Sequence, residues 1–154
     1  MNRKLAIAFS ILLLTPASLA LSQERKLKRE DLPPAVQKTV DEQSVGATVR
    51  GFATELENGR RLYEAELVVN GHSKDISMTR SGAIVEVEEE APLESLSVEV
   101  REGLKLMSRG GAITKVESLT KNGKLVAYEA VVKRGARRSE IQVDPNGKKL
   151  IHPE

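Results

Sequence analysis

The spacing of hydrophobic residues changes from a helical to an extended period early in the chain. Leu32, Val36 and Val40 recur every four residues, as they do along one face of an α-helix, and the prolines after Leu32 suit a first helical turn. From residue 47 to residue 57 the side chains instead follow a two-residue period. We therefore expect a helix that begins near Leu32 and ends near Gly46, followed directly by a strand.

Further strands are expected where this alternation lies between tight-turn signals. Tyr63 and Leu67 alternate with Glu64 and Glu66, and an Asn-Gly pair, a strong signal for a hairpin turn, stands before them. A helix would take the apolar side of such a strand and leave the glutamates facing water. The expected strands of this half span residues 47–57, 62–69, 74–79 and 83–88.

The second half of the chain repeats this pattern. Asn58-Gly59 and Tyr63-Glu64-Ala65 return as Asn122-Gly123 and Tyr128-Glu129-Ala130. Self-similarity over about sixty residues is typical of duplicated structural units. We predict the α+β fold class, with two tandem helix-plus-meander repeats at 31–90 and 91–154, each a helix packed on one face of a 3–4-stranded antiparallel sheet. The second unit should have a helix at 94–108 and strands at 112–121, 125–133, 137–143 and 148–151.

The beginning of the chain has the composition of an export signal. Arg3 and Lys4 precede an apolar run at 5–14, and small residues end at Ala20, which fits cleavage by a signal peptidase. The apolar run is short for a membrane span, although an uncleaved anchor helix is the alternative. We predict a signal peptide at 1–20 and a flexible charged leader at 21–30, in a protein located in the periplasm or, alternatively, outside the cell.

Charge and composition argue against several classes of protein. Removing the signal peptide takes away two of the 24 basic side chains, which leaves 22 against 22 acidic ones. A neutral chain with few aromatic residues lacks both the phosphate-neutralising charge and the stacking groups of nucleic-acid binders. The sequence also carries no serine-nucleophile or phosphate-loop motif, and His72 and His152 have no partner at a metal-ligand spacing. We expect neither an enzyme nor a bound cofactor.

Charged residues on the water-facing side of the strands are the candidates for partner contact. Side by side, two such sheet faces would offer a broad surface; the alternative is a solvated sheet with cross-strand charge pairs. A basic hairpin tip around Arg137 could instead touch anionic lipid or envelope polymers. The acidic run at 86–90 is interpreted as a solvated linker rather than a calcium site, because its spacing matches no known calcium loop. The candidate partner-binding residues are Arg50, Glu64, Glu66, Lys115, Glu117, Glu129, Lys133, Arg138 and Glu140.

Several short patterns together resemble a known family. Leu32-Pro-Pro-Ala-Val-Gln-Lys, an Asn-Gly turn, Tyr-Glu-Ala-Glu-Leu and Arg-Ser-Gly resemble the PepSY-like exported proteins, which are grouped with β-lactamase-inhibitor-like folds. The resemblance covers 31–152 in two copies, although Ser97-Val98 replaces Pro33-Pro34 in the second. It implies a non-catalytic cell-envelope module that binds a protein or inhibits a peptidase.

We therefore expect a monomeric protein-binding module, acting as a peptidase inhibitor or a chaperone-like regulator, without nucleic acid and without a stable membrane span. Its partner would be an envelope protein or peptidase. The alternatives are an envelope ligand-binding or stress-sensing module, or a purely structural envelope protein.

Overall fold

The computed structural model describes residues 24–150, 152 and 154. The predicted signal peptide at 1–20 lies outside these residues. Within them, two α-helices and two short 3₁₀-helices interrupt a succession of strands. In chain order the elements are β1 (Arg25–Leu27), η1 (Arg29–Asp31), α1 (Pro34–Gln43), β2 (Thr48–Glu57), β3 (Arg60–Val69), β4 (His72–Met78), β5 (Ile84–Glu90), η2 (Leu93–Ser95), α2 (Val98–Ser108), β6 (Ala112–Lys121), β7 (Lys124–Arg134) and β8 (Arg137–Val143).

Local sequence signals explain where these elements start and turn. The Ser97 hydroxyl accepts a hydrogen bond from the Val100 N–H at the start of α2, as helix-capping serines do. Asn58 and Asn122 adopt positive φ angles of 48° and 49°, and a glycine follows each in the same left-handed region. The Asn-Gly hairpin turns expected from the sequence are therefore confirmed.

All eight strands belong to one antiparallel sheet, in the order of the sequence from β1 to β8. The prediction of two tandem units with separate 3–4-stranded sheets is therefore wrong. β5 pairs with β6, with Glu88 opposite Leu119, so the two halves share a continuous hydrogen-bonded ladder. The physical reason is that an unpaired β5 edge would expose a row of N–H and C=O groups, which β6 satisfies.

The two ends of the described chain also differ from expectation. Arg25–Leu27, within the predicted flexible leader, forms β1 and pairs with β2, so this part of the leader prediction is wrong. Its charged residues, Arg25 and Lys26, are exposed, as suits an edge strand, and Lys26 forms an ion pair with Glu66. The strand expected at 148–151 is reduced to an isolated bridge between Val143 and Lys149.

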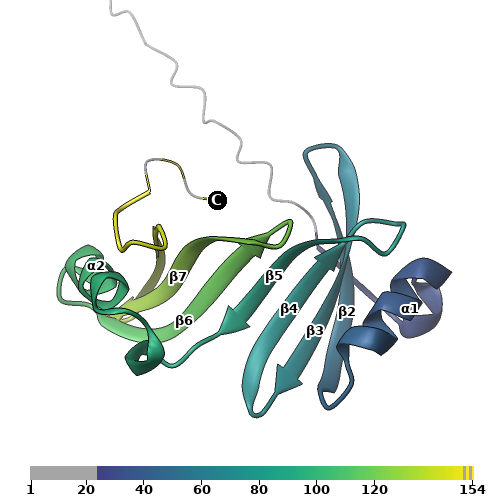
Figure 1. The fold of residues 1–154 in the computed structure, drawn as a ribbon, viewed down its shortest axis with the longest axis horizontal. Helices are drawn as coiled ribbons and strands as arrows, with labels where there is room; N and C mark the ends of the chain where they lie inside the picture. The colour runs from purple at the N-terminus through teal and green to yellow at the C-terminus, as the bar shows by residue number, and fades with distance from the viewer. Residues whose placement is uncertain (1–23, 151, 153) are drawn as a thin grey trace, which may run out of the picture.

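Both α-helices pack on the same face of the sheet, one at each end (Figure 1). Tyr63 is only 5% exposed and packs with Val36 and Val40 of α1, which confirms that the apolar side of β3 faces its helix. At the other end, Val100 and Leu104 of α2 pack against β6, β7 and β8. The first core contains Leu32, Val36, Val40, Tyr63, Ala65, Leu67, Ile76 and Met78, and the second contains Leu96, Val100, Leu104, Val116, Ala130 and Val143.

Candidate protein-binding face

The face of the sheet opposite the helices, called the open face below, is lined by polar side chains. Strand register determines its members, because residues directly opposite each other in a ladder share a face. Glu66 lies opposite Asp75, which lies opposite Glu88, while Glu117 lies opposite Glu129. The principal charged and polar residues of the open face are Glu64, Glu66, Ser73, Asp75, Ser77, Glu86, Glu88, Glu90, Lys115, Glu117, Glu129, Lys133, Arg138, Glu140 and Gln142.

Every candidate partner-binding residue except Arg50 lies on the open face. Arg50 falls within a β-bulge, where the register with β3 shifts between Val49 and Gly51, so the alternation that placed it does not hold there. The others are Glu64, Glu66, Lys115, Glu117, Glu129, Lys133, Arg138 and Glu140. They come from β3, β6, β7 and β8, so the single sheet brings together residues that two separate sheets would have divided.

Near the middle of the open face, carboxylates from several strands surround a hollow of about 110 Å³. Glu64, Asp75 and Glu88 come from β3, β4 and β5 and are half-buried, and no described residue forms an ion pair or hydrogen bond with any of their three carboxylates. We call Glu64, Asp75, Glu86 and Glu88 the acidic centre. The hollow is lined by these four residues together with Glu55 and Ser77.

Burial makes these carboxyl groups harder to ionise. Burial, followed by repulsion from Asp75, raises the pKa of the Glu64 carboxyl to about 7. Burial, followed by repulsion from Glu117, raises the pKa of Glu88 to about 7 as well. The pKa values of Asp75 and Glu86 are also raised, chiefly by burial. Within the acidic centre, Glu64, Asp75 and Glu88 therefore have no ion-pair partner among the described residues, whereas Glu86 is paired with Lys121.

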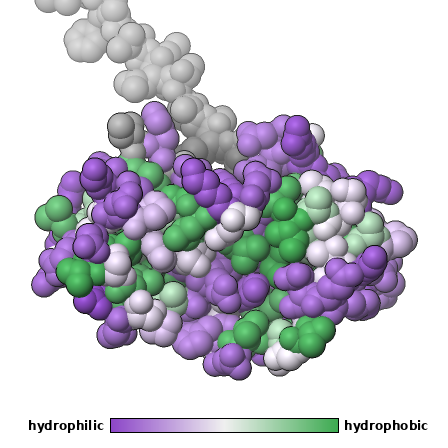
Figure 2. All heavy atoms as spheres, in the orientation of Figure 1, coloured by the Kyte–Doolittle hydropathy of each residue, from purple (hydrophilic) through white to green (hydrophobic). Residues whose placement is uncertain are grey.

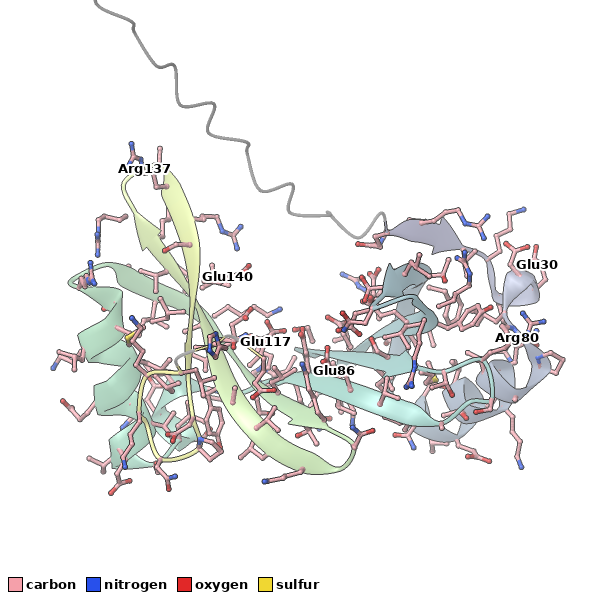
Figure 3. All side chains as sticks on the ribbon, turned by 90° about the horizontal axis from the view of Figure 1, so that it is seen from above. Glu30, Arg80, Glu86, Glu117, Arg137 and Glu140 are labelled. Carbon is pink, nitrogen blue, oxygen red and sulfur yellow. The ribbon has the colours of Figure 1, made fainter. Side chains whose placement is uncertain are left out.

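Glu117 is the most buried carboxylate of the open face, at 8% exposed, and unlike the acidic centre it has a cation. Lys115 Nζ lies 2.6 Å from Glu117 Oε1, and the Ser73 hydroxyl donates to the same oxygen over 3.4 Å. Burial is the largest single effect and opposes the charge of Lys115, but the hydrogen bond to Glu117 and the attraction of the surrounding carboxylates together raise the pKa of that ammonium. Figure 3 shows Glu117 and Glu86 near the middle of the molecule.

Three carboxylates of this region are close enough together to suggest a metal site. Oxygen atoms of Asp75, Glu88 and Glu117 lie within 4.8 Å of one another. Glu117 is already bonded to Lys115 and Ser73, so a divalent cation would have to displace an ammonium to gain that ligand.

The edges of the acidic region carry compensated charges. The Ser73 N–H donates to Glu90 Oε2 over 3.0 Å, which lowers the pKa of Glu90. Lys121 lies 3.5 Å from Glu86. At the α2 end of the face, Gln142 Nε2 donates to Glu129 Oε2 over 2.7 Å, and the Glu154 N–H donates to Gln142 Oε1 over 2.8 Å. Glu154 thus contacts the open face at β8, and its carboxylate lies 4.0 Å from Lys121, the same lysine that pairs with Glu86.

Sequence reasoning missed the residues at the heart of this face. The acidic run at 86–90 was expected to be a solvated linker, and that interpretation is wrong because it forms most of β5. Glu86 and Glu88 point to the open face, whereas Val87 packs against the core under α1. A strand was already expected at 83–88, and the alternation of Glu86 and Glu88 around Val87 within it was the available signal for the side on which these glutamates lie.

Hydrophobic surface is divided rather than continuous. Figure 2 shows separate hydrophobic patches with hydrophilic residues between them in that view. The exposed large hydrophobic residues of the described chain are Val45 in the turn after α1, Val49 and Leu56 on β2, and Val98 and Leu106 on α2. None of the described helices is long and apolar enough to cross a membrane.

Comparison with known proteins identifies the fold. The sequence matches no family model and no curated protein. A solved protein from Bacteroides eggerthii, named as a periplasmic protein, is similar with a TM-score of 0.63 and 18% identity over 77% of this chain and 86% of that chain. A DUF2874 family protein from Bacteroides ovatus gives 0.60 and 18% over 77% and 84%. A BLIP-like protein from Bacteroides fragilis gives 0.57 and 16% over 77% and 83%.

These similarities concern the fold. They show that this chain shares its fold with these BLIP-like and DUF2874 proteins, whereas the narrower resemblance to PepSY-like proteins stays a prediction. The predicted location in the periplasm agrees with the name of the Bacteroides eggerthii protein.

Proposed function

We propose that this chain is a non-catalytic periplasmic module that binds another protein of the cell envelope through the open face. The observation that carries this proposal is that, in the part of the chain that the structure describes, both α-helices lie on one face of the sheet and no helix covers the other. The uncovered face extends across eight strands. An extended and largely preformed polar surface suits the binding of a protein, with charged groups determining orientation and partner choice.

The same geometry gives less support to a small-molecule sensor. Sites for small ligands are typically mostly apolar clefts of roughly 300–1,000 Å³. The hollow at the acidic centre has about 110 Å³ and is lined by carboxylates. The fold similarity to a BLIP-like protein adds support for protein binding, and we extend the proposal to regulation of an envelope peptidase.

Affinity capture with the mature protein as bait in a periplasmic extract tests the proposal. The bait should retain one or a few envelope proteins at physiological salt. The variant Lys133→Glu/Arg138→Glu changes two exposed open-face cations and should weaken capture, because charge reversal at a rim chiefly slows association. A matched control, Lys38→Glu/Lys105→Glu, makes the same change of charge at exposed positions on the two helices.

The control variant distinguishes binding through the open face from a nonspecific effect of the change in net charge. Equal loss in both variants, or loss in the helix variant alone, would contradict binding through the open face. If a captured partner proves to be a peptidase, inhibition of its activity by the mature protein tests the regulatory extension separately.

A further inference from the structure

The distribution of cations over the open face is uneven. Lys26 pairs with Glu66, Lys115 with Glu117, and Lys121 with Glu86, so each of these lysines engages a carboxylate beside the hollow or at its rim. Within the described chain, Glu64, Asp75 and Glu88 have no cation within 4.0 Å. Glu64, Asp75 and Glu88 therefore line the hollow without a cation of the described chain beside them, whereas Glu86 has one.

Such an arrangement opposes folding unless something outside the chain compensates it. Half-buried carboxylates have lost part of their hydration, and like charges on β3, β4 and β5 repel one another across the ladder. A titratable group that is perturbed by burial and by charged neighbours, and that lines a concavity, is a candidate for a functional site. The raised pKa values of Glu64 and Glu88 reflect the same lack of compensation.

The structure itself contains an example of how a cation binds beside this hollow. The Lys115 ammonium reaches Glu117 from the neighbouring position on the same face of β6, next to Asp75 and Glu88. A primary ammonium or guanidinium on a flexible stem can thus reach carboxylates at this depth while its apolar stem lies along the sheet. The hollow of about 110 Å³ has room for such a group and little more.

We propose that the acidic centre is the contact point for a basic element of the protein partner, a projecting loop that inserts a lysine or arginine side chain between Glu64, Asp75 and Glu88. The occupant is a protein, because the surrounding open face offers further polar contacts over many strands, and its charge follows from complementarity with the unpaired carboxylates. A divalent cation fits less well, since Lys115 already holds one of the three possible ligands. This inference rests on the proposed function, because it names the chemistry of the partner at the same face.

Direct binding of a defined peptide tests the inference. The probe is a capped, fluorescein-labelled Gly-Ser peptide with four lysines, and its control replaces each lysine by uncharged norleucine. The measurements use the mature protein at pH 8, where the carboxylates are ionised. Glu64→Gln/Glu88→Gln should weaken binding of the lysine peptide by about tenfold, because two charge-assisted contacts are lost. Glu99→Gln/Glu102→Gln on the exposed side of α2, with the same change of charge, should leave binding nearly unchanged.

Two further measurements locate the bound peptide and test whether calcium displaces it. Amide chemical-shift changes on addition of the peptide should concentrate on β3, β4 and β5. Equal binding by the two variants, shifts spread over the whole surface, or shifts confined to the β7–β8 hairpin would overturn the inference. So would calcium that binds tightly, displaces the peptide and requires Asp75, Glu88 and Glu117 together, since the acidic centre would then be a metal site. Circular dichroism establishes that each variant is folded.

Failure of this inference and failure of the proposed function are distinguishable. A captured envelope protein that still binds Glu64→Gln/Glu88→Gln but not Lys133→Glu/Arg138→Glu would overturn the inference and leave binding through the open face intact. A lysine peptide that binds as expected, without any envelope protein being captured, would instead count against the proposed function.

Discussion

Gly103 in α2 lies directly against Gly147 in the turn after β8. A Cβ atom added to Gly103 would lie 2.0 Å from the Gly147 carbonyl oxygen, and one added to Gly147 would lie 2.0 Å from the Glu99 carbonyl oxygen. Helix and turn thus meet through their backbones, with no room for a side chain on either of these residues. This contact holds α2 against the C-terminal end of the sheet and keeps it off the open face.

Gly103→Ala should therefore destabilise the protein by about 2–3 kcal/mol through overpacking. Helix propensity alone predicts the opposite sign, because alanine is better than glycine in a helix by about 1 kcal/mol. Urea unfolding of the mature protein decides between the two. Stabilisation by this substitution would show that the helix and turn separate easily.

Gly147→Ala has a matched control elsewhere in the chain. Gly147 and Gly123 have the same φ of +77°, but nothing lies within 4 Å of a Cβ added to Gly123. Alanine at Gly123 costs only the left-handed conformation, about 1–2 kcal/mol. Gly147→Ala adds the clash and should be clearly more destabilising in the same unfolding experiment. Equal losses would argue against the close contact.

The sequence predicts those parts of the fold that depend on residues close together in the chain, and it fails where distant segments pair. Helix spacing and Asn-Gly turns are local, so α1, α2 and most strands were found near their observed positions. The pairing of β5 with β6 is non-local, because α2 and its flanking loops intervene between them. A local period cannot reveal which strand edges will meet, and for this reason two sheets were expected where there is one.

The Lys115–Glu117 pair offers a test of buried charge. Lys115→Met should destabilise the protein by about 1–3 kcal/mol, because it leaves the Glu117 carboxylate buried without its cation. Adding Glu117→Gln to this variant should recover much of the loss, since a neutral amide is cheaper to bury and the Ser73 hydroxyl remains beside it. Chemical denaturation of the two single variants and the double variant gives the coupling energy. Additive losses would mean that the two side chains do not interact.

The candidate site was predictable in its orientation but not in its centre. The alternation along β3 predicted that Glu64 and Glu66 lie on the other face of the sheet from Tyr63, and the structure confirms this assignment. Asp75 could not be identified in the same way, because its importance comes from lying opposite Glu66 and Glu88 on other strands. The unpaired state of these carboxylates is likewise a property of the assembled sheet.

The predicted export signal lies outside the described residues, so its cleavage needs a separate test. Arg3, Lys4, the apolar run at 5–14 and the small residues before Ala20 predict cleavage that leaves Leu21 as the first residue. Mass spectrometry of protein from a periplasmic fraction should find this N-terminus. Membrane-bound protein that retains Met1 would contradict it and would favour the anchor alternative.

The acidic centre also makes stability depend on pH in an unusual direction. Glu64 and Glu88 have pKa values of about 7 in the folded protein, above the ordinary value of 4.5 that the unfolded chain should show. The folded state therefore binds more protons on these two groups between these values, so their contribution to stability is complete below about pH 4.5 and is lost as the pH rises through about 7. Asp75, Glu86 and Glu129 have raised pKa values and act in the same direction.

Glu64→Gln/Glu88→Gln should therefore be more stable than the wild type at pH 8 and nearly equal to it at pH 4. After allowance for solvent screening of these half-buried groups, we expect a gain of about 1–2 kcal/mol at pH 8. Urea unfolding at a series of pH values measures it, with Glu99→Gln/Glu102→Gln on α2 as the control that should follow the wild type. The carboxylates that face Glu64 come from β2, β3 and β4, and those that face Glu88 from β4, β5, β6 and β7, so the amides relieve repulsion on every side. A wild type that gains stability from pH 5 to pH 8, with the double variant following the same curve, would show that these carboxylates are well solvated and would remove the reason to expect a cationic partner there.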